Sequence, residues 1–458
     1  MATITSDILT TVSSKESEKQ FPPAYFLSLT VENVRCFGPQ QTLDLSNGKG
    51  RPAQWTIILG NNGVGKTTLL KSLVALVPTR TQFDKEKIVV ARLFENSWAM
   101  AQWNPSRKGA AASSLSADFL IGVGLDDQQN GEQVKAFDVQ RTRDGSSAVG
   151  ATAKLEKLGG FVCFGYGASR RMGETALSED AGGDPFASLF SDDAPLLNAE
   201  EWLLQADYAA YAADNVLAKK RAKERRDTIK EILIKLLPDV EDIKFVQLTE
   251  KQLKPGIEVK TPYGWVSIKD LSLGYKTLIA WMVDFASRLF NRYPDSPNPL
   301  AEPAVVLVDE IDLHLHPKWQ RNLMSFLSGL FPNTQFIATA HSPLVVQAAT
   351  DANIVLLKRE GDHVVIDNDV KAIRGWRVDQ ILTSDLFGLE SARPPEMDGL
   401  LAERTKILSK GRLTKKDKER LEEIEARIGS LPTGETPEEI EAMDVIRRAA
   451  ERLKAQGY

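Results

Sequence analysis

One loop of nine residues constrains the fold of this 458-residue chain more than any other feature. The loop, GNNGVGKTT, follows the apolar run QWTIIL and leads into KTTLLKSLVALV, in which apolar residues recur at helical spacing. It fits the pattern G-x-x-x-x-G-K-[ST], whose glycines let backbone N–H groups curl around phosphates at the positive end of a helix. A strand, this loop and a helix in that order predict an α/β fold that binds a nucleoside triphosphate.

The loop also predicts individual roles. We expect all nine residues to contribute to nucleotide binding: Gly60, Asn61, Asn62, Gly63, Val64, Gly65, Lys66, Thr67 and Thr68. In this pattern the ammonium of Lys66 reaches the β- and γ-phosphate oxygens, and the hydroxyl of Thr67 ligates Mg²⁺. The alternative is a glycine-rich turn that only caps a helix.

A second apolar run, Val306–Pro317 (VLVDEIDLHLHP), ends in neighbouring carboxylates. A strand that ends here beside the phosphate-loop strand would deliver Asp309 to the magnesium shell and place Glu310 to polarise a water. The later run TQFIATAHS ends in His341, which suits a hydrogen bond to the γ-phosphate. We therefore predict Glu310, His341 and Lys66 as catalytic residues, with Thr67 and Asp309 as metal ligands.

The same run allows a rival interpretation, in which Asp312, His314 and His316 bind zinc or iron. The i, i+2 spacing puts both histidines on one side of a strand, but no cysteine or further histidine lies nearby. In a third interpretation the histidines only shape a turn before Pro317.

A short motif before this run indicates the class. IKDLSLGYKTLIAWM places Leu271, Ser272, Leu273 and Gly274 at the head of a predicted helix. It resembles the LSGG-type signature of ABC-class ATPases, and the order phosphate loop, signature, acidic strand end and histidine is typical of the SMC/RecF-like branch. The resemblance implies an α/β, ABC-type P-loop ATPase head with a mixed sheet and flanking antiparallel strands. It also implies ATP and Mg²⁺ as cofactors and a homodimer in which Ser272, Leu273 and Gly274 of one subunit bind the ATP held by the other.

The resemblance extends to further positions. Leu313, His314 and His316 occupy the D-loop position at the dimer seam. The class also has a Q-loop glutamine, and here CFGYGASRR takes its place, so Tyr166, Ser169 or Arg170 would substitute. Arg35 and Phe37 occupy the region that contacts adenine. The alternatives are a core position for Phe37 and a solvated loop for Arg170.

Five segments, NVRCFG, GYGASRR, LSLGYKTL, VDEIDLHLHPKWQRNL and FIATAHSPLVV, resemble the ATPase group of Septu and Septu-containing retron defence systems over residues 25–385. This resemblance implies an ATPase that regulates or scaffolds a separate HNH nuclease in anti-phage defence, with DNA or a retron nucleoprotein as a further partner.

Other functions remain open at this stage. A RecF- or SMC-like DNA-repair clamp would use the basic run AKKRAKERR and the basic stretch Arg404–Arg420. A built-in nuclease would need Asp367 and Asp369, but IVLLKREGDHVVID favours a β-hairpin that turns at Gly361. A transporter subunit is disfavoured by the missing glutamine and by the helical C-terminal region.

The chain divides into five predicted segments. These are a flexible tail (1–24), an N-terminal lobe with the phosphate loop (25–197), a helical insertion (198–238), a C-terminal lobe with the signature, acidic strand end and histidine (239–374), and a helical docking or dimerisation region (375–458). Between about 80 and 160 we expect irregular chain with short strands. A net charge of −5, two cysteines (Cys36 and Cys163) and the lack of a long apolar run predict a cytoplasmic protein without membrane contact.

Overall fold

The computed structural model describes residues 21–83, 86–94, 103–125, 131–142, 147–151, 155–174, 183–212, 215–246, 255–370, 373–389, 391–392, 394–410 and 413–429. The chain forms two units, Met1–Ile381 and Leu382–Tyr458. Most of the predicted tail, and residues 430–458 of the predicted C-terminal helical region, lie outside the described residues.

A six-stranded sheet forms the centre of the first unit, in the order β16-β15-β3-β14-β13-β9. Five strands run parallel, and β16 pairs antiparallel at the edge. Parallel strands are buried on both faces, which is why they read as continuous apolar runs in the sequence. The bounds are β3 Trp55–Gly60, β9 Cys163–Tyr166, β13 Ala304–Val308, β14 Thr334–Thr339, β15 Asn353–Glu360 and β16 His363–Asp367. The predicted hairpin at Gly361 is confirmed as β15 and β16.

A second, antiparallel sheet follows the order β2-β1-β6-β7-β8. Its strands are β1 Ala24–Glu32, β2 Gln41–Asp44, β6 Ala112–Ile121, β7 Glu132–Thr142 and β8 Ser147–Ala151, and a separate pair consists of β4 Pro78–Phe83 and β5 Glu86–Ala91. The short strands expected between 80 and 160 are therefore confirmed, but in the described residues of this range they form a regular sheet and a strand pair, not irregular chain. Leu115, Ala117 and Phe119 of β6 face the core, but serine and aspartate occupy positions between them and conceal the strand in the sequence.

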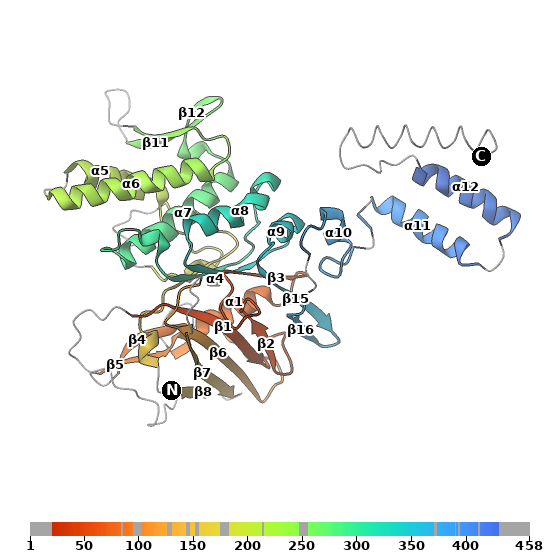
Figure 1. Ribbon diagram of the computed structural model, residues 1–458, viewed down its shortest axis with the longest axis horizontal. Helices are drawn as coiled ribbons and strands as arrows, with labels where there is room; N and C mark the ends of the chain where they lie inside the picture. The colour runs from red at the N-terminus through yellow and green to blue at the C-terminus, as the bar shows by residue number, and fades with distance from the viewer. Residues whose placement is uncertain are drawn as a thin grey trace. The chain divides into compact units, whose positions relative to one another are not determined.

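Helix α1 (Lys66–Ala75) lies between the two sheets (Figure 1). Its Leu69, Leu70 and Leu73 are fully buried in a core that contains residues of both sheets, among them Leu29 of β1 and Ile337 of β14. The phosphate loop is thus fixed at the start of a helix that packs on two sides.

Helices α7 (Leu273–Arg292), α8 (Pro317–Leu330) and α9 (Pro343–Ala348) lie on the opposite side of the central sheet from α1 (Figure 1). Phe285 of α7 packs on Phe331 with ring centroids 4.5 Å apart, and Trp55 of β3 stacks on Phe336 of β14 at 4.3 Å. Phe285 also contacts Phe336 of β14 at 6.5 Å and Phe164 of β9 at 5.8 Å, and these two contacts anchor the signature helix to the sheet.

The predicted helices between 198 and 237 are confirmed as α5 (Ala199–Ala212) and α6 (Val216–Leu236), and α4 (Ala187–Phe190) is a short helix before them. Asn215 caps α6 by accepting a hydrogen bond from the backbone N–H of Leu217 at 2.8 Å. A three-stranded sheet follows, with β10 Asp242–Val246, β11 Gly256–Thr261 and β12 Gly264–Ser267.

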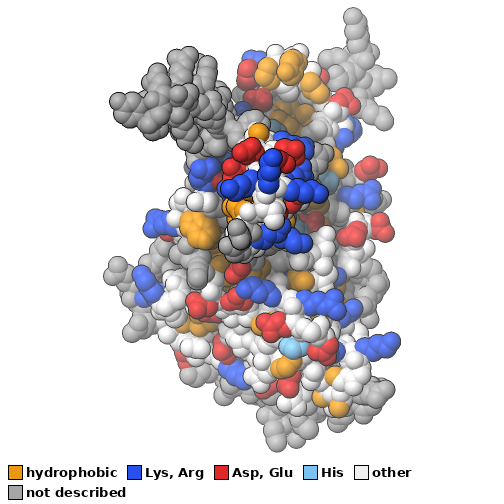
Figure 2. All heavy atoms as spheres, turned by 90° about the vertical axis from the view of Figure 1, so that its right-hand side faces the viewer, with side chains coloured by type: hydrophobic (Ala, Val, Ile, Leu, Met, Phe, Trp, Pro, Cys, Tyr) orange, Lys and Arg blue, Asp and Glu red, His pale blue; other side chains and the backbone are white. Residues whose placement is uncertain are grey.

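Helix α10 (Val378–Leu382) comes at the end of the first unit, and the second unit contains α11 (Pro395–Leu408) and α12 (Lys415–Gly429). Leu400, Ile407 and Ile424 form a small core between α11 and α12. On the face in Figure 2, Lys and Arg side chains are interspersed with Asp and Glu side chains. In the described part of the chain, no helix has both the length and the apolar character needed to cross a bilayer.

Candidate functional site

The phosphate loop adopts a backbone that its glycines make possible. Gly63 and Gly65 have φ angles of 79° and 93°, in the left-handed region that other residues rarely adopt. A Cβ on Gly65 would collide with the Sγ atom of Cys36 and lie 3.1 Å from the ring of Phe37. The loop therefore rests directly on the segment after β1, and a side chain at Gly65 would push it away.

Lys66 folds back over the loop in this structure. Its Nζ atom donates to the carbonyl oxygens of Gly60 and Asn61 at 2.8 and 3.1 Å. Burial lowers the pKa of Lys66, while Asp309, Glu310 and Asp312 oppose this effect. The cation thus lies near three acidic side chains, and an added phosphate would compete with the loop carbonyl oxygens for it.

Two threonines hold the carboxylate of Asp309. Thr67 donates its hydroxyl to Asp309 Oδ2 at 2.6 Å, and Thr339 donates its hydroxyl to Asp309 Oδ1 at 2.6 Å. The predicted metal ligands Thr67 and Asp309, which are 242 positions apart, therefore lie in direct contact. A hydroxyl and a carboxylate are the hard oxygen ligands that Mg²⁺ prefers, so this pair fits the ion. The sequence interpretation missed Thr339, whose signal is its place at the end of a buried strand two positions before His341.

Glu310 follows Asp309 in a left-handed conformation, with φ of 49°. Its backbone N–H donates to Thr339 Oγ1 at 2.7 Å. The side chain is half-buried, so it lies at the edge of the site rather than inside the core.

Arg170 holds the same backbone from the other side. Its guanidinium donates to the carbonyl oxygens of Asp309 at 2.6 Å, Glu310 at 2.9 Å and Gly167 at 3.2 Å. Burial lowers the pKa of Arg170 to about 10, against the opposing effect of nearby carboxylates, so it is charged at neutral pH. The solvated-loop alternative is wrong because Arg170 is buried and both of its terminal nitrogens donate to backbone carbonyl oxygens. The Q-loop role of Arg170 stays a prediction.

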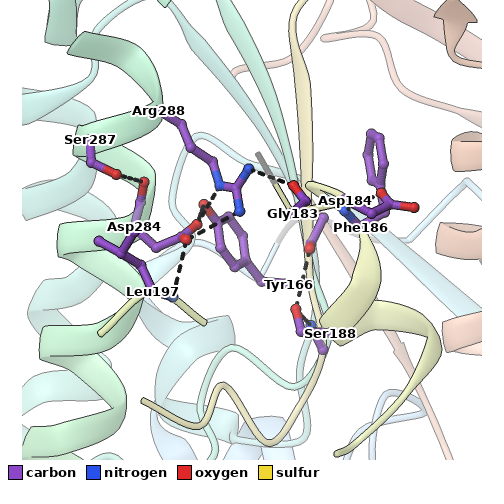
Figure 3. Close-up of polar contacts among 11 residues, drawn as sticks. Tyr166, Gly183, Asp184, Phe186, Ser188, Leu197, Asp284, Ser287 and Arg288 are labelled. Atoms are coloured by element: carbon purple, nitrogen blue, oxygen red, sulfur yellow. Dashed lines mark hydrogen bonds and ion pairs between the residues drawn. The ribbon is translucent and has the colours of Figure 1, made fainter. Parts of the chain in front are cut away.

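Tyr166, another residue predicted to substitute for the Q-loop glutamine, contacts helix α7. It is fully buried, and its hydroxyl donates to Asp284 Oδ2 of α7 at 2.8 Å, beside Arg288, which donates to the same carboxylate at 2.7 Å (Figure 3). Burial and Asp284 raise the pKa of Tyr166. The Tyr166 hydroxyl points toward α7 in this structure, and the Q-loop role of this residue stays a prediction. Ser169 donates to the carbonyl oxygen of Asp192 at 3.0 Å.

His341 is positioned by its backbone. Its N–H lies 3.2 and 3.1 Å from the two carboxylate oxygens of Asp312. Gln320 of α8 donates to the carbonyl oxygen of Asp312 at 3.2 Å and accepts from the hydroxyl of Ser342 at 2.6 Å. The histidine loop and the D-loop are thus joined within one subunit.

Two of the three residues in the rival metal-site interpretation, Asp312 and His316, make hydrogen bonds to the backbone. Asp312 accepts from His341, and Nδ1 of His316 caps α8 by accepting from the N–H of Lys318 at 3.3 Å. His314 is exposed, with φ of 63°. Within the described ranges, no group of three or more His, Cys, Asp or Glu side chains is arranged to hold a metal ion.

The signature lies on the surface at the start of α7. Ser272 is the N-cap residue, yet its hydroxyl makes no capping hydrogen bond, and Leu273 is 58% exposed. A Cβ on Gly274 would come 2.5 Å from the carbonyl oxygen of His314. The signature and the D-loop residues Leu313 and His314 therefore adjoin on one exposed face.

Arg35 and Phe37, the two residues predicted to contact adenine, lie in different environments. Phe37 is fully buried in the main core, which confirms its core alternative, and its adenine contact stays a prediction. Arg35 is exposed and donates to the carbonyl oxygen of Asn104 at 2.7 Å. Its role toward a base stays a prediction.

Comparison with known proteins agrees with this site. A family model described as "AAA domain, putative AbiEii toxin, Type IV TA system" matches residues 130–347, and a second AAA domain model matches residues 28–146. The Septu protein PtuA of Bacillus mycoides (strain KBAB4) is 25% identical over 389 residues, which are 84% of this chain and 48% of that protein. The "Retron Ec83 probable ATPase" of Escherichia coli is 43% identical over 132 residues, which are 29% of this chain and 23% of that protein. The chain thus matches half or less of the length of these relatives.

Two solved structures also match. The SMC head bound to the C-winged helix domain of ScpA covers 75% of this chain and 96% of its own at 16% identity and a TM-score of 0.41. RecF with ATP covers 77% and 100% at 12% identity and a TM-score of 0.39.

The phosphate loop and the paired Thr67 and Asp309 define the chain as an α/β P-loop head, which is similar to AAA domains and to proteins named as ATPases. Within this class it resembles the Septu protein PtuA and the ATPases of retrons, which confirms the resemblance that the motifs indicated.

Proposed function

We propose that the chain binds and hydrolyses ATP with Mg²⁺, dimerises around the nucleotides, and controls a separate HNH nuclease in anti-phage defence. The observation that carries this proposal is the contact of Thr67 with Asp309, because it joins the phosphate loop to the acidic strand end in the arrangement that ATP hydrolysis requires.

Each part of the site has a chemical task in this proposal. The loop N–H groups and Lys66 bind the phosphates, and Thr67 and Asp309 would hold Mg²⁺, which neutralises phosphate charge when bound. Glu310 polarises the attacking water, and His341 donates a hydrogen bond to the γ-phosphate. Arg170 and Thr339 keep the backbone of Glu310 fixed, so its carboxylate keeps its orientation during turnover.

The exposed signature supports a dimer. Ser272 has a hydroxyl that its own helix does not use, and it lies at a helix N-terminus, where anions bind well. A twofold dimer would bring this surface of one subunit to the phosphate loop of the other, with His314 and His316 at the seam.

We assign the nuclease to a separate partner because Asp367 and Asp369, the residues that a built-in nuclease would need, already make contacts at the β15–β16 hairpin. Asp367 pairs with Lys358 at 2.9 Å and accepts from the N–H of Asp369 at 3.1 Å. The names of the relatives, a Septu protein and retron ATPases, support a defence system. We also place the protein in the cytoplasm, since Cys36 and Cys163 are free thiols.

Ion pairs along α6 weigh against the DNA-repair clamp. Arg226 pairs with Asp207 at 2.7 Å, and Lys220 pairs with Glu224 at 3.7 Å. Part of the basic charge of this helix is thereby balanced within the protein, so the clamp is the second choice.

The test compares wild type with Glu310→Gln and Lys66→Ala by light scattering in ATP and Mg²⁺. We expect Glu310→Gln to accumulate as an ATP-bound dimer without releasing phosphate, and Lys66→Ala to bind no ATP and to form no such dimer. Phosphate release by Glu310→Gln at the wild-type rate would contradict the assigned role of this carboxylate.

A further inference from the structure

A groove runs beside α5, away from the phosphate loop. One pocket of about 630 Å³ lies among β9, α5 and α7, and a second of about 580 Å³ lies between α5 and α6. Both pockets are lined by Trp202 and Gln205, so they adjoin. We call the two together the α5 groove.

The part of the groove between α5 and α6 is lined in part by small apolar side chains. Four alanines line this part of the groove, namely Ala206, Ala209, Ala218 and Ala222. Leu217 at its rim is 56% exposed, and the ring of Trp202 stacks against Phe290 at 6.4 Å. Small side chains beside an aromatic ring leave space for the apolar side chains of another chain.

The charge of the groove is basic. Its lining includes Arg221, Arg225, Arg288 and Arg292, and Asp284 is the acidic residue among the lining positions. Arg288 is neutralised by Asp284 at 2.7 Å, and Arg221 contacts Asp295, whose side chain is 84% exposed. Burial and the nearby Arg221 lower the pKa of Arg225, as expected where two cations adjoin with little opposing charge.

The inner wall of the groove is connected to the catalytic backbone. Asp284 accepts the hydroxyl of Tyr166, and the carbonyl oxygen of Tyr166 accepts the N–H of Asp309 at 2.8 Å (Figure 3). Asp284 also belongs to α7, the helix that begins with the signature. Arg288 is therefore connected to the acidic strand end through three hydrogen bonds, so a ligand that displaces Arg288 would act on that strand end through Asp284 and Tyr166.

From this geometry we infer that the α5 groove is the docking site for an acidic, amphipathic segment of the nuclease partner. Apolar side chains of that segment would lie on the alanines and on Trp202, and its carboxylates would pair with Arg221 and Arg225. The basic lining selects an acidic protein segment as the occupant. The inference rests on the proposed function, since it names the surface on which that partner binds.

The test co-expresses the tagged ATPase with the neighbouring nuclease gene and measures the nuclease retained per ATPase, then the Kd of the purified pair. The charge variant is Arg221→Glu with Arg225→Glu, and Ala209→Trp fills the groove without changing charge. The control is Lys219→Glu with Lys220→Glu, which makes the same charge change at exposed positions of α6 that do not line the groove. Thermal unfolding and ATP-dependent dimerisation verify that each variant is folded.

We expect both groove variants to raise the Kd at least about tenfold, and the control to change it less than about twofold. Replacing the acidic residues of the partner segment by lysine should restore binding to the charge variant. Equal loss in the control, or wild-type binding by both groove variants, would overturn the docking site while leaving the proposed function intact. If wild type retains no nuclease at all, the proposed function fails and the docking site fails with it.

Discussion

Thr339→Val should lower the free energy of unfolding far more than Thr334→Val, the same substitution five positions earlier in strand β14. Thr339 and Thr334 are both fully buried. The Thr339 hydroxyl donates to Asp309 and accepts from the N–H of Glu310, at 2.6 and 2.7 Å. In the described structure, the Thr334 hydroxyl is buried without a hydrogen-bond partner.

The magnitude follows from these contacts. A hydrogen bond to a charged group contributes about 1.5–3 kcal/mol, and a buried N–H left without an acceptor costs about 1–3 kcal/mol. Partial relaxation reduces the sum, so we expect Thr339→Val to lower the free energy of unfolding by about 3 kcal/mol. Thr334→Val replaces an unsatisfied hydroxyl by a methyl group, so its effect should be between zero and about 1 kcal/mol of stabilisation.

Urea denaturation followed by tryptophan fluorescence measures the difference, because Trp55 stacks on Phe336 of the same strand. The ATPase rate of Thr339→Val should also fall at least about tenfold, since Glu310 loses one support of its backbone. Equal stability of the two variants would refute the view that Thr339 fixes the acidic strand end.

Three further predictions concern other positions. Arg170→Lys retains charge but replaces two guanidinium nitrogens, which reach three carbonyl oxygens, by a single ammonium nitrogen, so we expect the ATPase kcat to fall with little change in KM; a change in KM alone would contradict the bracing role. Gly274→Ala places a methyl group against the carbonyl oxygen of His314, so ATP-dependent dimerisation should weaken while ATP binding by the monomer is retained, as fluorescent-nucleotide titration would show. Burial raises the pKa of Tyr293 to about 12, so the folded state binds the phenolic proton more tightly than the unfolded state, and stability should fall between pH 10 and 12 as pH rises. Tyr293→Phe should remove this part of the alkaline loss, and an identical alkaline decline in both proteins would argue against it.

The central sheet was predictable because its strands are short apolar runs, several of which lead directly into a recognisable motif. AVVLV and QFIATA are buried on both faces as β13 and β14, and the residues after them meet at one edge of the sheet. The pairing of Thr67 with Asp309 follows from the same rule. Thr339 was within reach of this reasoning, since it ends the same buried strand.

Arg170 and Tyr166 were not predictable in the same way. Their roles depend on β9 lying parallel to β13 with Tyr166 opposite Val308, a register between segments about 140 residues apart that no local pattern encodes. The first half of β6 was harder to predict, because small polar residues such as Ser114 and Ser116 stand beside its core residue Leu115. Local composition there is typical of loops, and only pairing with β1 makes the segment a strand.

The most direct test of the account mixes two inactive variants, Lys66→Ala and Ser272→Arg, and measures ATP hydrolysis after subunit exchange. If the signature acts on the nucleotide of the other subunit, each mixed dimer holds one intact site formed by an unaltered phosphate loop and an unaltered signature. Neither variant alone forms an intact site, so all hydrolysis by the mixture should come from mixed dimers, and each of these should reach at most about half of the wild-type rate. No recovery, with mixed dimers shown to form, would contradict a shared ATP site.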